Sequence, residues 1–108
     1  MTHRKRIAVD FDGVIHSYDK GWQDGSIYGD PISGAIEALE KLRKEFAVFI
    51  FTTRAGKQKL EIQSWLQKSG ASFWNEIEIT DKKEPAIAYI DDRAIRFTNW
   101  ADIKKYFQ

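Results

Sequence analysis

The chain has 108 residues, a length typical of one domain, and 43% of them are hydrophobic and 14% aromatic. These proportions exclude a disordered or low-complexity chain. Because the sequence contains no cysteine and only two histidines, it excludes a disulfide scaffold, a thiol nucleophile and a zinc site built from cysteine or histidine. The net charge of +1 favours neither nucleic acids nor acidic membranes as partners.

No apolar run is long enough to span a membrane, and no hydrophobic segment of signal-peptide length follows the basic N-terminal residues. We therefore expect a cytoplasmic protein without a membrane partner. No internal repeat, linker or change in composition marks a boundary, which predicts a single domain over residues 1–108.

Short apolar runs predict strands over residues 7–11, 47–51, 76–80 and 86–90, with a weaker fifth over 95–97. Helical spacing of apolar residues predicts helices over residues 35–46, 57–68 and 100–107. Ser33 and Asn99 are the expected N-caps, and Gly70 is the expected stop of the middle helix. The order predicts a small doubly wound, Rossmann-like α/β fold with a mostly parallel sheet and right-handed crossovers.

Ligands of open α/β sheets bind beyond the carboxyl ends of the strands, and polar residues gather there in this sequence. The first strand ends in Asp10-Phe11-Asp12-Gly13, the second in Thr52-Thr53-Arg54, and the fourth in Asp91-Asp92-Arg93. Asp10 interrupts a run expected to be buried, where a carboxylate is costly unless it meets a cation or hydrogen-bond donors. Each acidic pair could equally be an ordinary turn, but together they suit a divalent cation.

The hydroxyl and lysine candidates each come in pairs. Thr52 and Thr53 precede a helix whose start could bind phosphate, although threonine is also common at strand ends. Lys82 and Lys83 precede the fourth strand, where ordinary solvated lysines are the alternative. Acidic residues, Mg²⁺, a lysine and a hydroxyl group are together what phosphoryl transfer requires.

This ordered set resembles the haloacid dehalogenase (HAD) superfamily, whose members are mostly Mg²⁺-dependent phosphohydrolases on a Rossmann-like sheet. Its motifs run from Asp10 to Asp92, and the Ile-Asp-Asp-Arg ending is similar to that of small bacterial and phage HAD-like hydrolases. The resemblance implies that Asp10 is the nucleophile and that Asp12 is the general acid and base.

The resemblance also implies a Mg²⁺ site formed by Asp10, the backbone carbonyl of Asp12, Asp91 and, directly or through water, Asp92. Phosphate-binding candidates are then Thr52, Thr53, Arg54 and Lys83. We favour Thr52 because it directly follows the apolar strand, and Lys83 because of its eight-residue spacing to Asp91.

Neither loop of the sequence is long enough for the cap domain that many HAD phosphatases carry. We therefore expect an open site that takes a phosphorylated substrate, small or polymeric, or that a second subunit completes. Trp22 could stack on a base or anchor its loop. His16 could contact substrate, although a histidine in a polar loop is usually solvated. Arg54 and Arg93 could bind a second phosphate or pair with the acidic residues.

The expected function is that of a Mg²⁺-dependent phosphomonoesterase, with a nucleotide or nucleic-acid phosphate as the suggested substrate. The alternative is a non-catalytic module that keeps the metal site and binds phosphate or a partner. A receiver-type signalling domain would place its acidic pair near the N-terminus and its lysine near the end, which is not the order found here.

Overall fold

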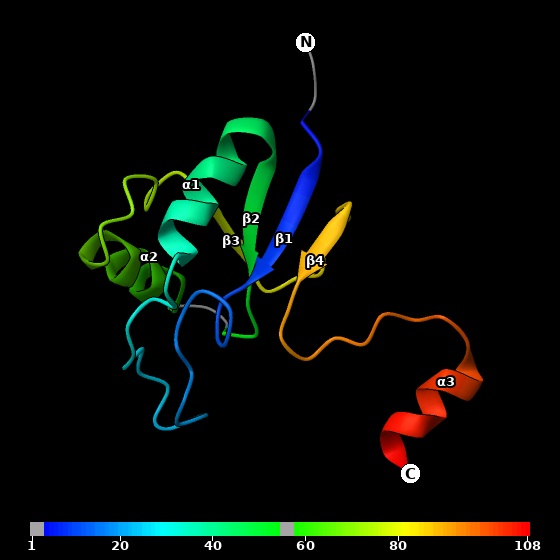
Figure 1. Cartoon of the computed structure of the whole chain (residues 1–108). Coiled ribbons are helices and arrows are strands. Elements are labelled where there is room, and N and C mark those ends of the chain that lie inside the picture. The colour runs from blue at the N-terminus through cyan, green and yellow to red at the C-terminus, as the bar shows by residue number, and fades with distance from the viewer. Residues whose placement is uncertain (1–3, 55–57) are drawn as a thin grey trace.

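The computed structural model describes residues 4–54 and 58–108 of the chain. Four parallel strands form one sheet in the order β3-β2-β1-β4 (Figure 1). The strands are β1 (Arg6–Asp10), β2 (Ala47–Phe51), β3 (Glu78–Thr80) and β4 (Ala88–Ile90). The two central strands have five residues each, and the two edge strands are shorter than their apolar runs predict.

The central strands are apolar because they are covered on both faces, as parallel strands usually are. Ile7 and Val9 of β1 point to one face and belong to the main hydrophobic core, whereas Ala8 is buried on the other face. The register pairs Asp10 with Phe51, so β1 and β2 end at the same level. This edge therefore receives the residues that follow each strand.

Two helices, α1 (Ala35–Glu45) and α2 (Gln58–Lys68), cover the face of the sheet that carries Ile7 and Val9. Their buried residues Leu39, Ile62 and Leu66 belong to the same core cluster as the strand residues. Burying each such side chain stabilises the fold by about 1.5–3 kcal/mol.

The helix ends differ in part from expectation. The N-cap of α1 is Gly34, in a left-handed conformation with φ of 83° and without a side-chain cap, so the prediction of Ser33 as N-cap is wrong. Gly70 follows α2 with φ of 86°, which confirms it as the helix stop because glycine adopts this conformation readily. The predicted first residue of α2, Lys57, lies outside the described residues.

The other face of the sheet is partly covered by Arg6 and by the segment that crosses from β3 to β4. Phe49 is buried there, and the Arg6 guanidinium lies 4.3 Å from its ring centroid. Arg6 also forms ion pairs of 3.0 Å with Glu84 in the crossing segment and 3.1 Å with Glu78 of β3. The extended Arg6 side chain thus covers apolar surface on this face, whereas helices cover the opposite face.

The C-terminal part of the chain stands away from the sheet in Figure 1. It ends in α3 (Trp100–Lys104), which continues as the 3₁₀ turn η1 (Lys105–Phe107). Asn99 caps α3 as predicted, because its side chain accepts a hydrogen bond from the Asp102 N–H at 2.9 Å. Residues 95–97 form no strand, so that prediction is wrong: in this conformation they leave the sheet before they can pair with β4.

The prediction of a small Rossmann-like α/β fold without a cap domain is confirmed, although α3 does not cover the sheet. Residues 12–31 form the long loop expected after β1. Within the described ranges, no helix has the length and apolar character needed to cross a bilayer.

Candidate functional site

Three carboxylates meet beyond the carboxyl ends of β1 and β4. Asp10 is the last residue of β1, and Asp91 and Asp92 follow β4, which pairs with β1 through Val9 and Ile90. One oxygen of each carboxylate lies within 4.8 Å of those of the other two. The structure thus brings together the three acidic side chains that the sequence proposes as metal ligands.

Burial and negative charge change the proton affinity of Asp10. Its pKa is raised from 3.8 to about 6, first because burial penalises the charged form and then because Asp91, Asp92 and Asp12 are close. A hydrogen bond of 2.9 Å from the Phe11 N–H to Asp10 Oδ1 acts in the opposite direction. A cation at this position would neutralise the charge that the three carboxylates share.

The type of donor atom in the cluster and the spacing of these atoms both suit a hard divalent cation such as Mg²⁺. Carboxylate oxygens are the ligands that Mg²⁺ prefers, and ligands on opposite sides of the ion stand about 4.2 Å apart. The three oxygens lie within 4.8 Å of one another, which is close to this separation. Water would complete the coordination, as is usual for Mg²⁺.

Gly13 allows the Asp92 carboxylate to come this close. It has φ of 87°, a conformation that favours glycine, and a Cβ at this position would collide with the Asp92 carboxylate. The turn around it is held by N–H groups of residues 14–16, which all donate to the Phe11 carbonyl oxygen. Glycine is therefore required at position 13, because the turn after β1 packs directly against Asp92, which follows β4.

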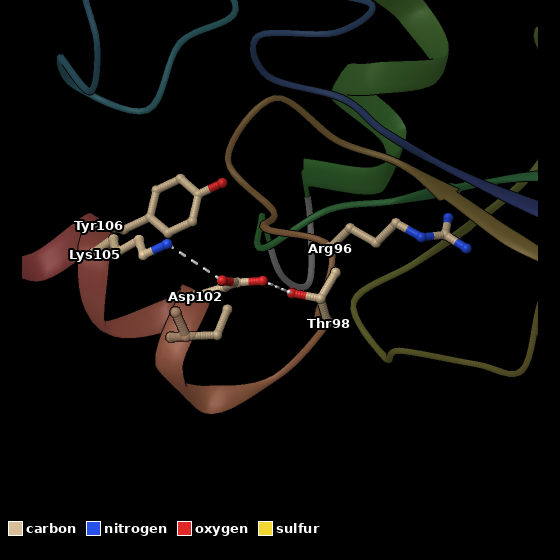
Figure 2. Close-up of a pocket in the computed structure, with 6 residues that line it drawn as sticks. Arg96, Thr98, Asp102, Lys105 and Tyr106 are labelled. Carbon is tan, nitrogen blue, oxygen red and sulfur yellow. Dashed lines mark hydrogen bonds and ion pairs between the residues drawn. The ribbon is translucent and has the colours of Figure 1, made fainter.

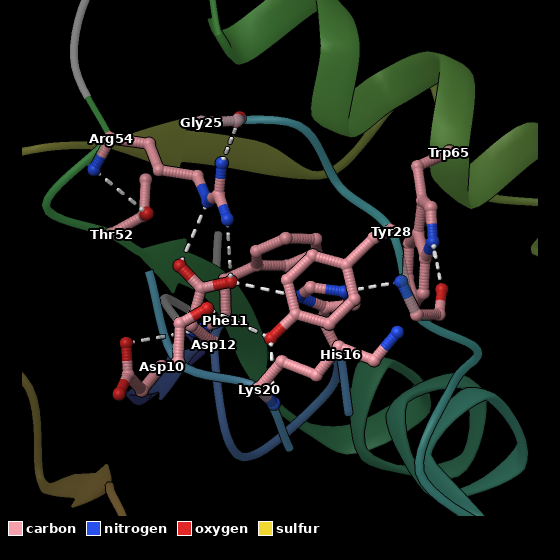
Figure 3. Close-up of polar contacts among 12 residues, drawn as sticks. Asp10, Phe11, Asp12, His16, Lys20, Gly25, Tyr28, Thr52, Arg54 and Trp65 are labelled. Carbon is pink, nitrogen blue, oxygen red and sulfur yellow. Dashed lines mark hydrogen bonds and ion pairs between the residues drawn. The ribbon is translucent and has the colours of Figure 1, made fainter. Parts of the chain in front are cut away.

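The Asp12 side chain faces a different set of partners (Figure 3). Arg54 Nε donates to Asp12 Oδ2 at 2.8 Å, and Arg54 Nη2 donates to Asp12 Oδ1 at 3.1 Å. Arg54 Nη1 donates to the Gly25 carbonyl oxygen at 2.6 Å and to Gln58 Oε1 at 2.8 Å. Of the two alternatives for Arg54, pairing with an acidic residue is thus the one that the structure shows.

His16 also holds Asp12, and its burial differs from the expectation of a solvated histidine. Its ring is fully buried against Phe11 and Trp65, with Nδ1 2.8 Å from Asp12 Oδ1. The Gly29 N–H donates to His16 Nε2 at 2.9 Å. Because Nε2 accepts this bond, the ring proton is on Nδ1 and is donated to Asp12.

The sequence carried a signal for this arrangement. His16 follows Asp12 by four residues, and aromatic residues surround it at positions 11, 18 and 28. A polar loop with this many aromatic residues has its own small core, where a histidine can be buried with both ring nitrogens bonded.

The two threonines have different environments. Thr52 is buried, and its hydroxyl oxygen accepts a hydrogen bond of 3.1 Å from the Arg54 N–H. Thr53 is exposed and lines the hollow that contains Asp10 and Asp12. The structure therefore brings Thr53 to the acidic cluster, although the sequence favours Thr52 because of its position at the strand end.

Lys83 lies beside the cluster. Lys83 lines a hollow together with Asp10, Asp91 and Tyr89, and its Nζ lies 5.0 Å from the Tyr89 ring centroid. The backbone N–H of Lys82 donates to Thr80 Oγ1 in the turn after β3. This arrangement agrees with the choice of Lys83 from its spacing.

The hollow at the acidic cluster has a volume of about 250 Å³ and is partly open to solvent. Tyr18, Phe51 and Arg93 also line it. The Arg93 N–H donates to Asp91 Oδ1 at 2.7 Å, which orients that carboxylate. Trp22 is 62% exposed, and its ring centroid lies 5.7 Å from the guanidinium of Arg54, the residue that holds Asp12.

Comparison with known proteins supports the fold and adds no function. A solved structure, that of a conserved protein from Bacteroides thetaiotaomicron, superposes with a TM-score of 0.64 at 25% identity. The match covers 97% of this chain and 90% of that one. No family model matches the chain, and no curated protein matches it.

Proposed function

We propose that the protein is a Mg²⁺-dependent phosphomonoesterase that uses Asp10 as its nucleophile. The observation that carries this proposal is the meeting of Asp10, Asp91 and Asp92 at the carboxyl ends of β1 and β4. Lys83 and Thr53 flank this cluster from two other segments. Along the chain, these residues follow one another in the order of the HAD motifs.

Asp10 would attack the phosphorus atom of the substrate, forming an aspartyl phosphate as the bond to the leaving oxygen breaks. Lys83 would balance the charge of the phosphoryl group, and the Thr53 hydroxyl would donate a hydrogen bond to it. A bound Mg²⁺ would neutralise charge on both the phosphoryl oxygens and the acidic residues. The exposed position of the cluster suits a phosphate at the end of a bulky group such as a nucleotide or an oligonucleotide.

Asp12 would give a proton to the leaving oxygen and then take one from the attacking water. His16 and Arg54 are positioning residues in this scheme because both of them hold the Asp12 carboxylate. The water would hydrolyse the aspartyl phosphate, releasing inorganic phosphate and restoring Asp10.

The test is phosphate release from p-nitrophenyl phosphate and from oligonucleotides with 3′- or 5′-phosphates, with Mg²⁺ and with EDTA. We expect turnover that needs Mg²⁺, is lost in Asp10→Asn and is retained in Asp81→Asn, a change of an exposed acidic residue. Turnover that persists in Asp10→Asn or in EDTA would contradict the proposal.

The second candidate function is a non-catalytic module that binds phosphate through the same cation. The observation that favours it is that both oxygens of Asp12 already accept hydrogen bonds from Arg54 and His16. Such a module would bind Mg²⁺ and inorganic phosphate in calorimetry and release no phosphate from any of the substrates above.

A further inference from the structure

The last fifteen residues lead into a short helix and expose large apolar side chains. We call residues 94–108 the C-terminal arm. Phe97 is 58% exposed, Trp100 71% and Phe107 76%. The radius of gyration is 15.0 Å, whereas a compact chain of this length has about 13 Å, which reflects the arm's position away from the sheet.

The arm is ordered by its own polar contacts rather than by the sheet. Thr98 Oγ1 and Asn99 Nδ2 both donate to Asp102 Oδ2, and Lys105 Nζ lies 3.5 Å from Asp102 Oδ1. Figure 2 shows Thr98, Asp102 and Lys105 around a hollow between α3 and the segment that leads into it.

Trp100, Ile103 and Phe107 recur at helical spacing along this unit. The Phe97 ring packs edge-to-face on Trp100 with a centroid distance of 5.4 Å. The arm therefore carries an apolar stripe, which is typical of a helix that packs on another surface.

A matching apolar surface lies on the body of the protein, between α1 and β4. This groove has a volume of about 250 Å³ and is lined mainly by aliphatic side chains, among them Val9, Ile32, Leu42 and Ile90. Pockets for small organic ligands usually have about 300–1,000 Å³ and a few convergent polar groups. The groove is smaller than that and suits one or two apolar side chains of a protein segment.

Strand β4 adds a second place for the arm to dock. It is the last strand of the sheet on that side, and its Tyr89 and Ile90 are each 42% exposed. An edge strand presents backbone N–H and C=O groups that can pair with another strand. Residues 95–97 of the arm have the sequence pattern of a strand and lie outside the sheet.

We propose that two copies of this chain exchange their C-terminal arms, each arm docking in the groove and along β4 of the other copy. The arm runs outward from its own sheet, which is the direction that exchange requires. A twofold-symmetric exchange closes the dimer and leaves neither groove free. Two arms and two grooves would together bury roughly 2,000 Å², within the range of stable interfaces.

The first test is the mass of the full-length protein by analytical ultracentrifugation over a wide concentration range. We expect a dimer, and we expect the Trp100→Ser/Phe107→Ser double variant to sediment as a folded monomer. The matched control is Leu60→Ser, which removes a 70%-exposed leucine from α2 and should leave the dimer intact. A monomeric wild type, or a dimer that survives the arm substitutions, would overturn the proposal.

The second test distinguishes exchange from an arm that folds back on its own groove. Because the chain has no cysteine, Ala38→Cys in the groove and Ile103→Cys in the arm supply the two reactive thiols of a double variant. A flexible bismaleimide should then link two chains covalently. A link within one chain, or no link, would overturn the proposal.

Discussion

The Asp10 carboxyl is placed where the fold makes its charge costly. With a pKa raised from 3.8 to about 6, the folded chain binds more protons than the unfolded chain between these two pH values. Stability therefore falls as pH rises through this interval, and above about pH 6 the folded state carries the full cost of the buried charge. A bound cation would offset this cost, because its positive charge stabilises the ionised carboxylate.

The Asp10→Asn variant tests this cost directly. Without Mg²⁺ at pH 8, we expect the free energy of unfolding of the variant to exceed that of the wild type by on the order of 1–3 kcal/mol. Near pH 4 we expect little difference between the two proteins. The measurement is urea denaturation at both pH values in EDTA. A difference that is the same at pH 4 and pH 8 would show that the Asp10 charge is not its cause.

Gly13 gives a second prediction for single residues. Alanine at Gly13 or at Gly21 meets a positive φ, of 87° and 66°, which costs roughly 1–2 kcal/mol in either case. Only at Gly13 does the new Cβ collide with the Asp92 carboxylate, because Gly21 has no neighbour within 4 Å. We expect Gly13→Ala to lower Mg²⁺ affinity by roughly tenfold or more, and Gly21→Ala to leave it unchanged.

Calorimetric titration with Mg²⁺ measures both variants. Equal affinities in Gly13→Ala and wild type would mean that Asp92 moves aside without loss, and hence that it does not help to bind the cation.

At the scale of the element, the loop of residues 12–31 is closed on itself by a buried histidine. His16 accepts the Gly29 N–H, donates to Asp12 and packs against Trp65 of α2. The Trp65 indole N–H in turn donates to the Gly29 carbonyl oxygen at 2.9 Å. His16 thus joins the two ends of the loop, and Trp65 bonds the loop to α2.

We expect His16→Ala to destabilise the protein by about 2–4 kcal/mol, because it leaves a cavity and an unpaired N–H at Gly29. Asp19→Ala changes an exposed residue of the same loop and should stay within about 0.5 kcal/mol of wild type. Urea denaturation measures both. A loss below 0.5 kcal/mol for His16→Ala would mean that the loop is held by other contacts.

The elements also show which sequence signals suffice for prediction. Residues 47–51 form a strand because their apolar run is covered on both faces, and Asn99 begins a helix because its side chain caps it locally. Residues 95–97 have a similar local pattern and form no strand, because a strand also needs a neighbour and this segment leaves β4. The N-cap of α1 is Gly34 rather than Ser33, and the left-handed conformation of Gly34 directs the chain into the helix.

At the scale of the whole molecule, a bound cation should stabilise the folded state because the three carboxylates converge only in that state. They come from opposite ends of the chain, at positions 10, 91 and 92. Mg²⁺ at a concentration 100 times its dissociation constant would add about 2.7 kcal/mol to the free energy of unfolding.

We expect thermal unfolding to shift to higher temperature with Mg²⁺ and to return with EDTA. The shift should be lost in Asp91→Asn and kept in Asp81→Asn, which changes an exposed acidic residue outside the cluster. Equal shifts in the two variants would mean that the cation binds elsewhere.

The sequence by itself determined the sheet and the place of the acidic cluster. Apolar runs that end in Asp10 and before Asp91 predict parallel strands whose carboxyl ends meet, since local pattern and the general geometry of such sheets are enough for that inference. It also favoured Lys83 over Lys82 from spacing alone.

Only the tertiary structure decided the contacts between segments far apart in the chain. It paired Arg54 with Asp12, buried His16 between Asp12 and Gly29, and turned Thr53 rather than Thr52 toward the cluster. These outcomes depend on which side chains meet across a core, and local sequence patterns carry little information about distances between remote residues. The position of the C-terminal arm, away from the sheet, is likewise a feature of the tertiary structure that the local sequence pattern did not predict.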